Sequence, residues 1–130
     1  MISSFHLSRP LHCYIAKKIY IGSMIEKLDQ IKALASPLRM EVLRVLDKPN
    51  ENFAHQESAD PAKVGVCMNM IAEHFSVSQP TMSRHLDLLK RANFISTVKQ
   101  QKWTYCLRNE KALADYADWM RQSLNVKPPG

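Results

Sequence analysis

The sequence predicts a mainly α-helical domain that carries one small β-hairpin. Two observations support this fold class. Apolar residues recur at helical spacing in several segments separated by polar turns, which is typical of amphipathic helices. Two short runs rich in β-branched and aromatic residues are separated by only two polar residues, which is typical of a hairpin. A chain of 130 residues is long enough for one domain with its own core.

The chain divides into an extension, a domain and a tail. Residues 1–23 contain three cations, no acid and no sustained periodicity. We therefore expect them to be a flexible extension, or to precede the true start of the protein at Met24. Residues 24–124 are expected to form the domain, and residues 125–130 a short C-terminal tail.

The composition favours a cytoplasmic protein with a polyanionic partner. Lys and Arg total 18 against 12 Asp and Glu, which gives a formal charge of +6. The three cysteines lie far apart without a C-x-x-C pair, so a reducing compartment is expected. Since no apolar run is long enough to cross a bilayer, we expect no membrane partner.

The first half of the domain predicts two helices and a loop. The segment MIEKLDQIKALAS places Ile25 and Leu28 on one apolar face, with charges opposite. Ser36 followed by Pro37 predicts the N-cap and first turn of a second helix, which continues as LRMEVLRVLDK. The polar segment KPNENFAHQESADPAKVG is expected to be an exposed loop.

A third and a fourth helix follow in close succession. The run VCMNMIAEHF predicts a short helix that ends at a tight turn before Ser78. Ser78 is expected to cap the next helix by accepting from the backbone of its third residue, and Pro80 falls where a missing N–H costs nothing. The buried stripe of this fourth helix is expected to consist of Met82, Leu86 and Leu89.

The opposite face of the fourth helix carries Gln79, Thr81 and Arg84. A short helix, a turn and a second helix form the pattern of a helix-turn-helix, so we call the fourth helix the reading helix. Glutamine can pair with adenine, arginine with guanine, and small hydroxyls with phosphates or bases; a merely solvated face is the alternative. The candidate DNA contacts on this helix are Ser78, Gln79, Thr81, Ser83, Arg84 and His85. His85 is expected either to lie half-buried beside Leu86 or to contact a phosphate.

The hairpin is predicted from residues 94–99 and 102–108, with Gln100 and Gln101 between them. Alternation places Trp103, Tyr105 and Leu107 on one face, and Lys102, Thr104, Cys106 and Arg108 on the other. With Lys99 and Lys102 near its tip, the hairpin is expected to lie along a phosphate backbone. Between residues 78 and 108 there are six cations and one acid, which is typical of a DNA-binding surface.

The last helix is predicted in the segment NEKALADYADWMRQSL. Its apolar stripe fits either the core of a single domain or a dimer interface with the first helix. Because the middle helices already provide a core, we expect a homodimer formed through the first and last helices. The candidate dimerisation residues are Ile25, Leu28, Leu113, Tyr116, Ala117 and Met120.

Three segments resemble the ArsR/SmtB family of bacterial winged-helix repressors: IKALASPLRMEVLRVL, SQPTMSRHLDLLKRANFI and KQQKWTYCLRNE. The resemblance covers roughly residues 25 to 124, and SQPTMSRHL is highly specific to the family's reading helix. It implies a winged helix-turn-helix fold and a homodimeric repressor that binds a double-stranded DNA operator and is released by an inducer. The sequence departs from the family at the hairpin tip, where Gln100 and Gln101 replace a common glycine.

The family's metal sites are incomplete in this sequence. The thiolate C-x-C motif falls on Cys67 and Asn69, and the last helix has no histidine. We therefore expect no cofactor and assign no metal ligands, although Cys67 remains a weak candidate as a ligand together with His12 or Cys13, or as a redox thiol. A small buried hydrophobe at a helix start is the simpler interpretation of Cys67, and Cys106 on the polar face of the hairpin is a weaker redox candidate.

No catalytic motif is recognised. His55-Gln56-Glu57 has the H-x-E form of zinc deaminases, but the P-C-x-x-C partner is missing, so we expect no enzyme activity. The alternative function is a winged-helix module that binds protein or structured RNA without operator specificity. In that case the outward Gln79, Thr81 and Arg84 would be dispensable for affinity.

Overall fold

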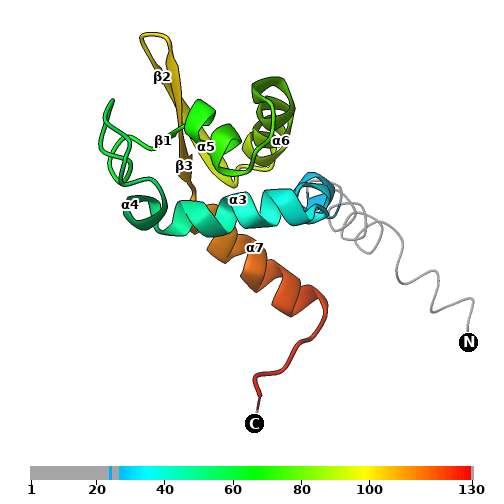
Figure 1. Cartoon of the computed structure of the whole chain (residues 1–130). Coiled ribbons are helices and arrows are strands. Elements are labelled where there is room, and N and C mark those ends of the chain that lie inside the picture. Colours follow the sequence, from blue (N-terminus) through cyan, green and yellow to red (C-terminus); the bar gives the residue numbers. More distant parts are fainter. Residues whose placement is uncertain (1–23, 25–26, 130) are drawn as a thin grey trace, which may run out of the picture.

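The protein is a set of helices packed around a small antiparallel sheet, as Figure 1 shows for this computed structural model. The structure describes residue 24 and residues 27–129, and residues 27–34 are helical. The other elements are α3 (Pro37–Asp47), α4 (Pro49–Asn52), β1 (Val66–Cys67), α5 (Met68–His74), α6 (Gln79–Arg91), β2 (Ile95–Gln100), β3 (Trp103–Arg108) and α7 (Glu110–Ser123). The expected mainly α fold with a β-hairpin is confirmed.

The sheet has three strands in the order β1-β3-β2. The predicted hairpin is present, with Ile95 opposite Arg108 and Gln100 opposite Trp103. Its two-residue turn therefore begins at Gln101, one residue later than expected, and Gln101 has a φ of 55°. This positive φ is the conformation that glycine adopts most easily, so the glutamine fills the tip at some cost in backbone strain.

Strand β1 was not predicted from the sequence. Val66 and Cys67, expected in the third helix, pair instead with Cys106 and Tyr105 of β3, and the helix begins at Met68. The close approach of the two backbones requires Gly65, whose φ is 112° and where an added Cβ would lie 2.7 Å from the Cys106 carbonyl oxygen. A strand of two residues is too short to show an alternation of its own, so its apolar residues were assigned to the helical pattern of α5.

The pairing with β1 makes β3 the central strand and buries both of its faces. Tyr105 is only 3% exposed and Cys106 only 1%. The expectation that Cys106 lies on a polar face of the hairpin was therefore wrong. Alternation was correctly predicted, but β1 and the neighbouring helices cover the base of the hairpin, so only its outer part is free.

The segment between α4 and β1 is more than the exposed loop expected from its polarity. Phe53 is completely buried in the core. The Gln56 side chain is also buried, and its Nε2 donates to the carbonyl oxygens of Ala59 and Gly65 at 2.8 and 3.0 Å. Its Oε1 accepts from the backbone N–H of Cys67 at 2.8 Å. One amide therefore closes the loop onto the sheet and satisfies backbone groups that would otherwise be buried unpaired.

Candidate nucleic-acid interface

The reading helix α6 is positioned by its cap and its buried stripe. Ser78 is the N-cap, and its hydroxyl accepts from the backbone N–H of Thr81 at 3.4 Å. Met82, Leu86 and Leu89 are buried, as the spacing predicted. This packing fixes the rotation of the helix about its axis and turns the remaining face outward. Exposed on that face are Gln79, Thr81, Arg84, Asp87 and Leu88.

The turn between α5 and α6 also has defined geometry. Ser76 has a φ of 52°, its N–H donates to the Glu73 carbonyl, and the Val77 N–H donates to the Ala72 carbonyl. These two bonds form a Schellman motif that ends α5. The chain then enters α6 two residues later. The short helix, turn and second helix of a helix-turn-helix are thus present where the sequence predicted them.

The hydroxyl groups of the reading helix differ in the hydrogen bonds that they already make within the chain. The Ser78 Oγ donates to the Thr81 Oγ1 at 2.9 Å while it accepts from the Thr81 backbone. Ser78 is therefore occupied by capping, whereas the Thr81 hydroxyl retains its own proton for an external acceptor. Ser83 lies half-buried one turn later and faces the sheet. Gln79, Thr81 and Arg84 are the exposed candidate contacts whose side-chain donors, within the described residues, remain free for an external acceptor.

His85 is turned inward rather than toward solvent. It is half-buried, and its Nδ1 lies 2.9 Å from a guanidinium nitrogen of Arg39 on α3. Burial, and secondly the Arg39 charge, lower the pKa of His85 below its ordinary value. The neutral imidazole is therefore favoured at neutral pH. His85 was named from the sequence among the candidate DNA contacts, and its partner Arg39 was not predicted.

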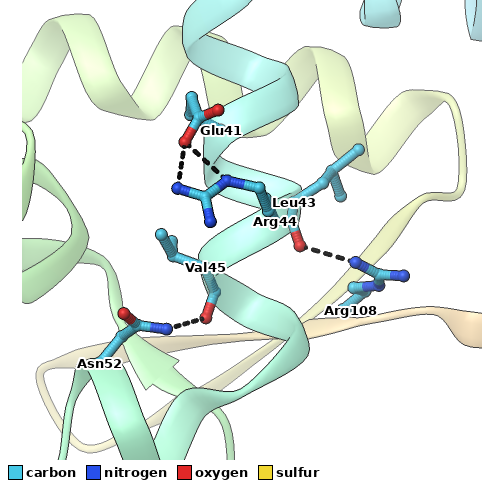
Figure 2. Close-up of polar contacts among 6 residues, drawn as sticks. All are labelled: Glu41, Leu43, Arg44, Val45, Asn52 and Arg108. Carbon is cyan, nitrogen blue, oxygen red and sulfur yellow. Dashed lines mark hydrogen bonds and ion pairs between the residues drawn. The ribbon is translucent and has the colours of Figure 1, made fainter.

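The outer part of the hairpin, or wing, presents two lysines to solvent. Lys99 and Lys102 are both exposed, and the Lys102 Nζ lies 5.0 Å from the centre of the Trp103 ring. This contact holds the lysine over the outer surface of the wing. Arg108 at the base behaves differently, because it donates to the Leu43 carbonyl on α3 at 2.9 Å, as Figure 2 shows, and pairs with Glu110 at 2.7 Å. Its inclusion among the DNA-facing cations was therefore wrong.

A cleft of about 190 Å³ lies between the reading helix and the sheet. Polar side chains line it from both sides, and Cys106 lies at its floor. Two residues that line the cleft, Thr97 and Thr104, had no role predicted from the sequence, although the hairpin register places them on one face together with Lys99. The polar residues that line the cleft are Ser83, Asp87, Lys90, Thr97 and Thr104.

Some residues of the expected dimer interface pack within the chain, and others are exposed. Tyr116 packs edge-on against Phe94 with ring centres 5.4 Å apart, so this part of the α7 stripe contributes to the core of the chain itself. Leu113 and Met120 are half-buried, and Ala117 is exposed. On the first helix Leu28 is 44% exposed, while Ile25 lies outside the described residues.

The first and last helices contact each other in space, although they lie at opposite ends of the domain sequence. The Lys27 Nζ is 5.7 Å from the centre of the Trp119 ring. Both helices also leave apolar side chains partly exposed, among them Leu28 and Met120. This contact joins the two helices within one chain, and dimerisation through them stays a prediction.

The cysteines show no metal centre. Within residues 24 and 27–129, no group of three or more His, Cys, Asp or Glu side chains is arranged to hold a metal ion. Cys67 is 4% exposed at the start of α5, and its suggested partners His12 and Cys13 lie outside the described residues. Burial and the nearby Cys67 raise the pKa of Cys106 to about 12, so its thiol remains protonated and unreactive at neutral pH.

Comparison with known proteins agrees with this geometry. The family model described as bacterial regulatory protein, arsR family, matches residues 66–97. YbzH of Bacillus subtilis (strain 168), an uncharacterized HTH-type transcriptional regulator, is 32% identical over 100 residues, which is 77% of this chain and all of YbzH. The transcriptional repressor SdpR of the same organism is 40% identical over 55 residues, 42% of this chain and 61% of SdpR.

Solved structures show the same fold. The crystal structure of an ArsR family transcriptional regulator superposes with a TM-score of 0.59 at 19% identity, over 78% of this chain and 94% of that one. HlyU from Vibrio cholerae N16961 superposes with a TM-score of 0.51 at 18% identity, over 77% and 94%. At these identities the likeness concerns the fold alone, which is that of the winged-helix regulators.

The capped reading helix, the turn before it and the wing beside it define a winged helix-turn-helix protein of the DNA-binding class. The full-length match to YbzH and the family model over the helix-turn-helix make the assignment more specific. The chain belongs to the ArsR family of bacterial regulatory proteins and is a transcriptional regulator. No helix in the described part of the chain is both long and apolar enough to cross a membrane.

Proposed function

We propose that the protein is a homodimeric repressor that binds one double-stranded DNA operator in the cytoplasm and is released by an inducer. It acts by binding rather than by catalysis. Gln79, Thr81 and Arg84 contact bases in the major groove, and Lys99 and Lys102 contact the phosphates beside it. The repressor activity of the similar protein SdpR agrees with this role.

The exposed face of the reading helix carries the proposal. Its polar side chains are held by a cap and by a fully buried apolar stripe, but they make no ion pair within the described chain. An arginine on a rigid helix can bind guanine through two parallel hydrogen bonds without losing another partner. Such a face is preorganised for an external ligand, whereas a merely solvated face does not require this support.

The proposed dimer determines the symmetry of the operator sequence. Two chains joined through their first and last helices are related by a two-fold axis, so their reading helices point in opposite directions. Such dimers place the two helices in successive major grooves, about 34–36 Å apart, and bind a palindromic site. The candidate residues on this interface are Leu28, Leu113, Tyr116, Ala117 and Met120, together with Ile25.

Fluorescence anisotropy tests the proposal directly. The purified protein is titrated into a duplex taken from the region upstream of its own gene, and into a scrambled duplex, at two salt concentrations. We expect the upstream duplex to bind tighter by a factor on the order of a thousand, with a preference that survives the higher salt.

The opposite result has a clear meaning. Equal binding to the upstream duplex, the scrambled duplex and duplexes selected from a random pool, with affinity that collapses in high salt, would contradict operator recognition. The basic face would then bind another polyanion, and the module that binds protein or structured RNA would become the better account. If specific binding is found, the same assay identifies inducers by the release of DNA.

A further inference from the structure

Three elements of the fold meet at the buried side chain of Arg39, on the first turn of α3. Its Nε donates to the Ala33 carbonyl at 2.6 Å, and its Nη2 donates to the Lys32 carbonyl at 3.1 Å. Its Nη1 lies 2.9 Å from the Nδ1 of His85 on the reading helix. Arg39 is only 9% exposed and makes no ion pair within the described chain.

The two carbonyls belong to the last turn of the first helix, which spans residues 27–34. Carbonyls at a helix C-terminus have no partner within the helix, and a cation there also interacts favourably with the helix dipole. The planar guanidinium can reach both carbonyls and still direct a third N–H elsewhere. An ammonium group cannot reproduce this fixed geometry.

The third N–H determines the state of His85. A guanidinium has donors only, so the Nδ1 of His85 must accept the hydrogen bond. The ring is therefore neutral, with its proton on Nε2. A proton on Nδ1 would place two donors against each other, and a doubly protonated ring would also place a second positive charge beside the guanidinium.

A second contact ties the same two helices together. The Gln30 side chain of the first helix donates through Nε2 to the carbonyl of Ala92 at 3.1 Å. Ala92 is the C-cap of α6, so this bond is made at the far end of the reading helix. The first helix therefore holds the reading helix near its middle, through Arg39, and at its C-terminal end.

We propose that Arg39 and His85 are positioning residues for DNA recognition: the bond from the Arg39 guanidinium to the neutral His85 ring sets the reading helix against the first helix. His85 acts through its Nδ1, toward the protein, and is not itself a phosphate contact. The inference rests on the proposed operator binding. Because the first helix also belongs to the expected dimer interface, the bonds of Arg39 link this interface to the base-reading face.

Two substitutions at position 85 separate the two roles of the ring. In His85→Asn the amide oxygen takes the place of Nδ1 and can accept from Arg39, but nothing replaces Nε2. In His85→Gln the longer side chain places an amide nitrogen near Nε2, and the acceptor toward Arg39 is lost. A positioning residue should be rescued by asparagine, and a phosphate contact by glutamine.

Operator and scrambled-duplex affinities are measured by anisotropy for both variants, with thermal unfolding as a control for folding. We expect His85→Gln to weaken operator binding by about tenfold, since a lost hydrogen bond to a charged group typically has this effect. Its binding to scrambled duplex should change by less than about threefold, and His85→Asn should recover most of the operator affinity. Arg39→Lys should behave like His85→Gln. Rescue by glutamine, or equal loss in both variants, would overturn the proposal.

The wild-type protein supplies a second measurement that needs no variant and no DNA. Nitrogen-15 NMR of the imidazole ring distinguishes a protonated from an unprotonated ring nitrogen. We expect His85 to carry its proton on Nε2 at neutral pH, and a proton on Nδ1 would overturn the inference. If the wild-type protein discriminates no duplex while the ring has the expected state, the proposed operator binding fails, and the inferred bond between Arg39 and His85 does not.

Discussion

The helices α6 and α7 have similar lengths and similar patterns but different surroundings. α6 has 13 residues and α7 has 14, and each begins with a side-chain cap, from Ser78 and Asn109. α6 buries three large apolar side chains, whereas the only buried residue within α7 is Ala112. An amphipathic repeat alone therefore does not tell whether the apolar face is covered by the same chain or by another copy.

The charged faces of the two helices differ in the same way. In α7, Lys111 pairs with Asp115 at 2.8 Å and Arg121 with Asp118 at 2.9 Å. On α6, Arg84 makes no ion pair within the described residues. Four charged side chains of α7 are therefore paired within the helix, whereas Arg84 of α6 remains unpaired within the described residues.

The largest effect is expected from the buried stripe of α6. Leu89 is completely buried, so Leu89→Ala should lower the free energy of unfolding by about 2–5 kcal/mol, from lost burial and the cavity left behind. Leu88 lies next to it but is 40% exposed, and Leu88→Ala should cost about 0.5 kcal/mol or less. Urea unfolding measures both, and equal losses would contradict the assigned rotation of the reading helix.

The apolar stripe of α7 should instead affect association. Met120 is half-buried in a single chain, and Met120→Asp would bury an unpaired charge in the proposed dimer interface. We expect the dimer to weaken by roughly a hundredfold, measured by sedimentation equilibrium. Gln122→Asp introduces the same charge at an exposed position and is the matched control. A Met120→Asp protein that remains as dimeric as this control would show that α7 is not the interface.

The charged faces should differ in their effect on DNA. Arg84→Ala should reduce discrimination between operator and scrambled duplex by about 1–3 kcal/mol, because a bidentate base contact is lost. Arg121→Ala removes an arginine already paired within α7 and should leave discrimination unchanged. Lys102→Ala should weaken binding to both duplexes about equally and reduce the salt slope by about one. Uniform weakening by Arg84→Ala as well would contradict base reading by this residue.

The two N-caps should contribute equally to stability but not to DNA binding. Ser78→Ala and Asn109→Ala should each lower the free energy of unfolding by about 1 kcal/mol, measured by thermal unfolding. Only Ser78→Ala should also weaken operator binding, because Ser78 fixes the first turn of the reading helix and the position of Thr81. Equal effects of both substitutions on DNA binding would point to general destabilisation instead.

The smallest difference is expected in the dependence of stability on pH. The pKa of His85 on α6 is lowered by burial and by Arg39, so its contribution is present above the ordinary histidine pKa of about 6.5 and is lost as the pH falls through the folded-state value. Burial raises the pKa of Tyr116 on α7, so its contribution is present below about 10 and is lost as the pH rises through its raised value. Urea unfolding across pH measures both, and His85→Asn should flatten the acid limb alone. An unchanged acid limb would assign the loss of stability to another group.

Features that depend on neighbouring residues were predictable from the sequence. Ser78, Pro80 and the apolar repeat of α6 act within a few turns of chain, and the structure confirms the cap, the helix and its buried stripe. The same holds for Ser36 and Pro37 at the start of α3. Such signals are local because a cap and an amphipathic face are properties of one helix.

Features that depend on distant residues were not predictable in the same way. Cys106 is buried because β1 pairs with β3 across 40 positions of sequence, and Arg108 turns inward because the Leu43 carbonyl is nearby. No role was predicted for Arg39, because its partners come from two other helices. Alternation and charge indicate which face a side chain takes, but they do not indicate what covers that face.

The single amide of Gln56 has a consequence for the length of the chain. Because it binds the backbone at both ends of the segment from Ala59 to Gly65, it closes this excursion independently of the residues in between. Lengthening a closed surface loop costs little conformational entropy, and Lys63 in this segment is exposed. The segment is therefore a suitable place to insert a peptide tag or a fluorescent label that leaves the base-reading surface intact.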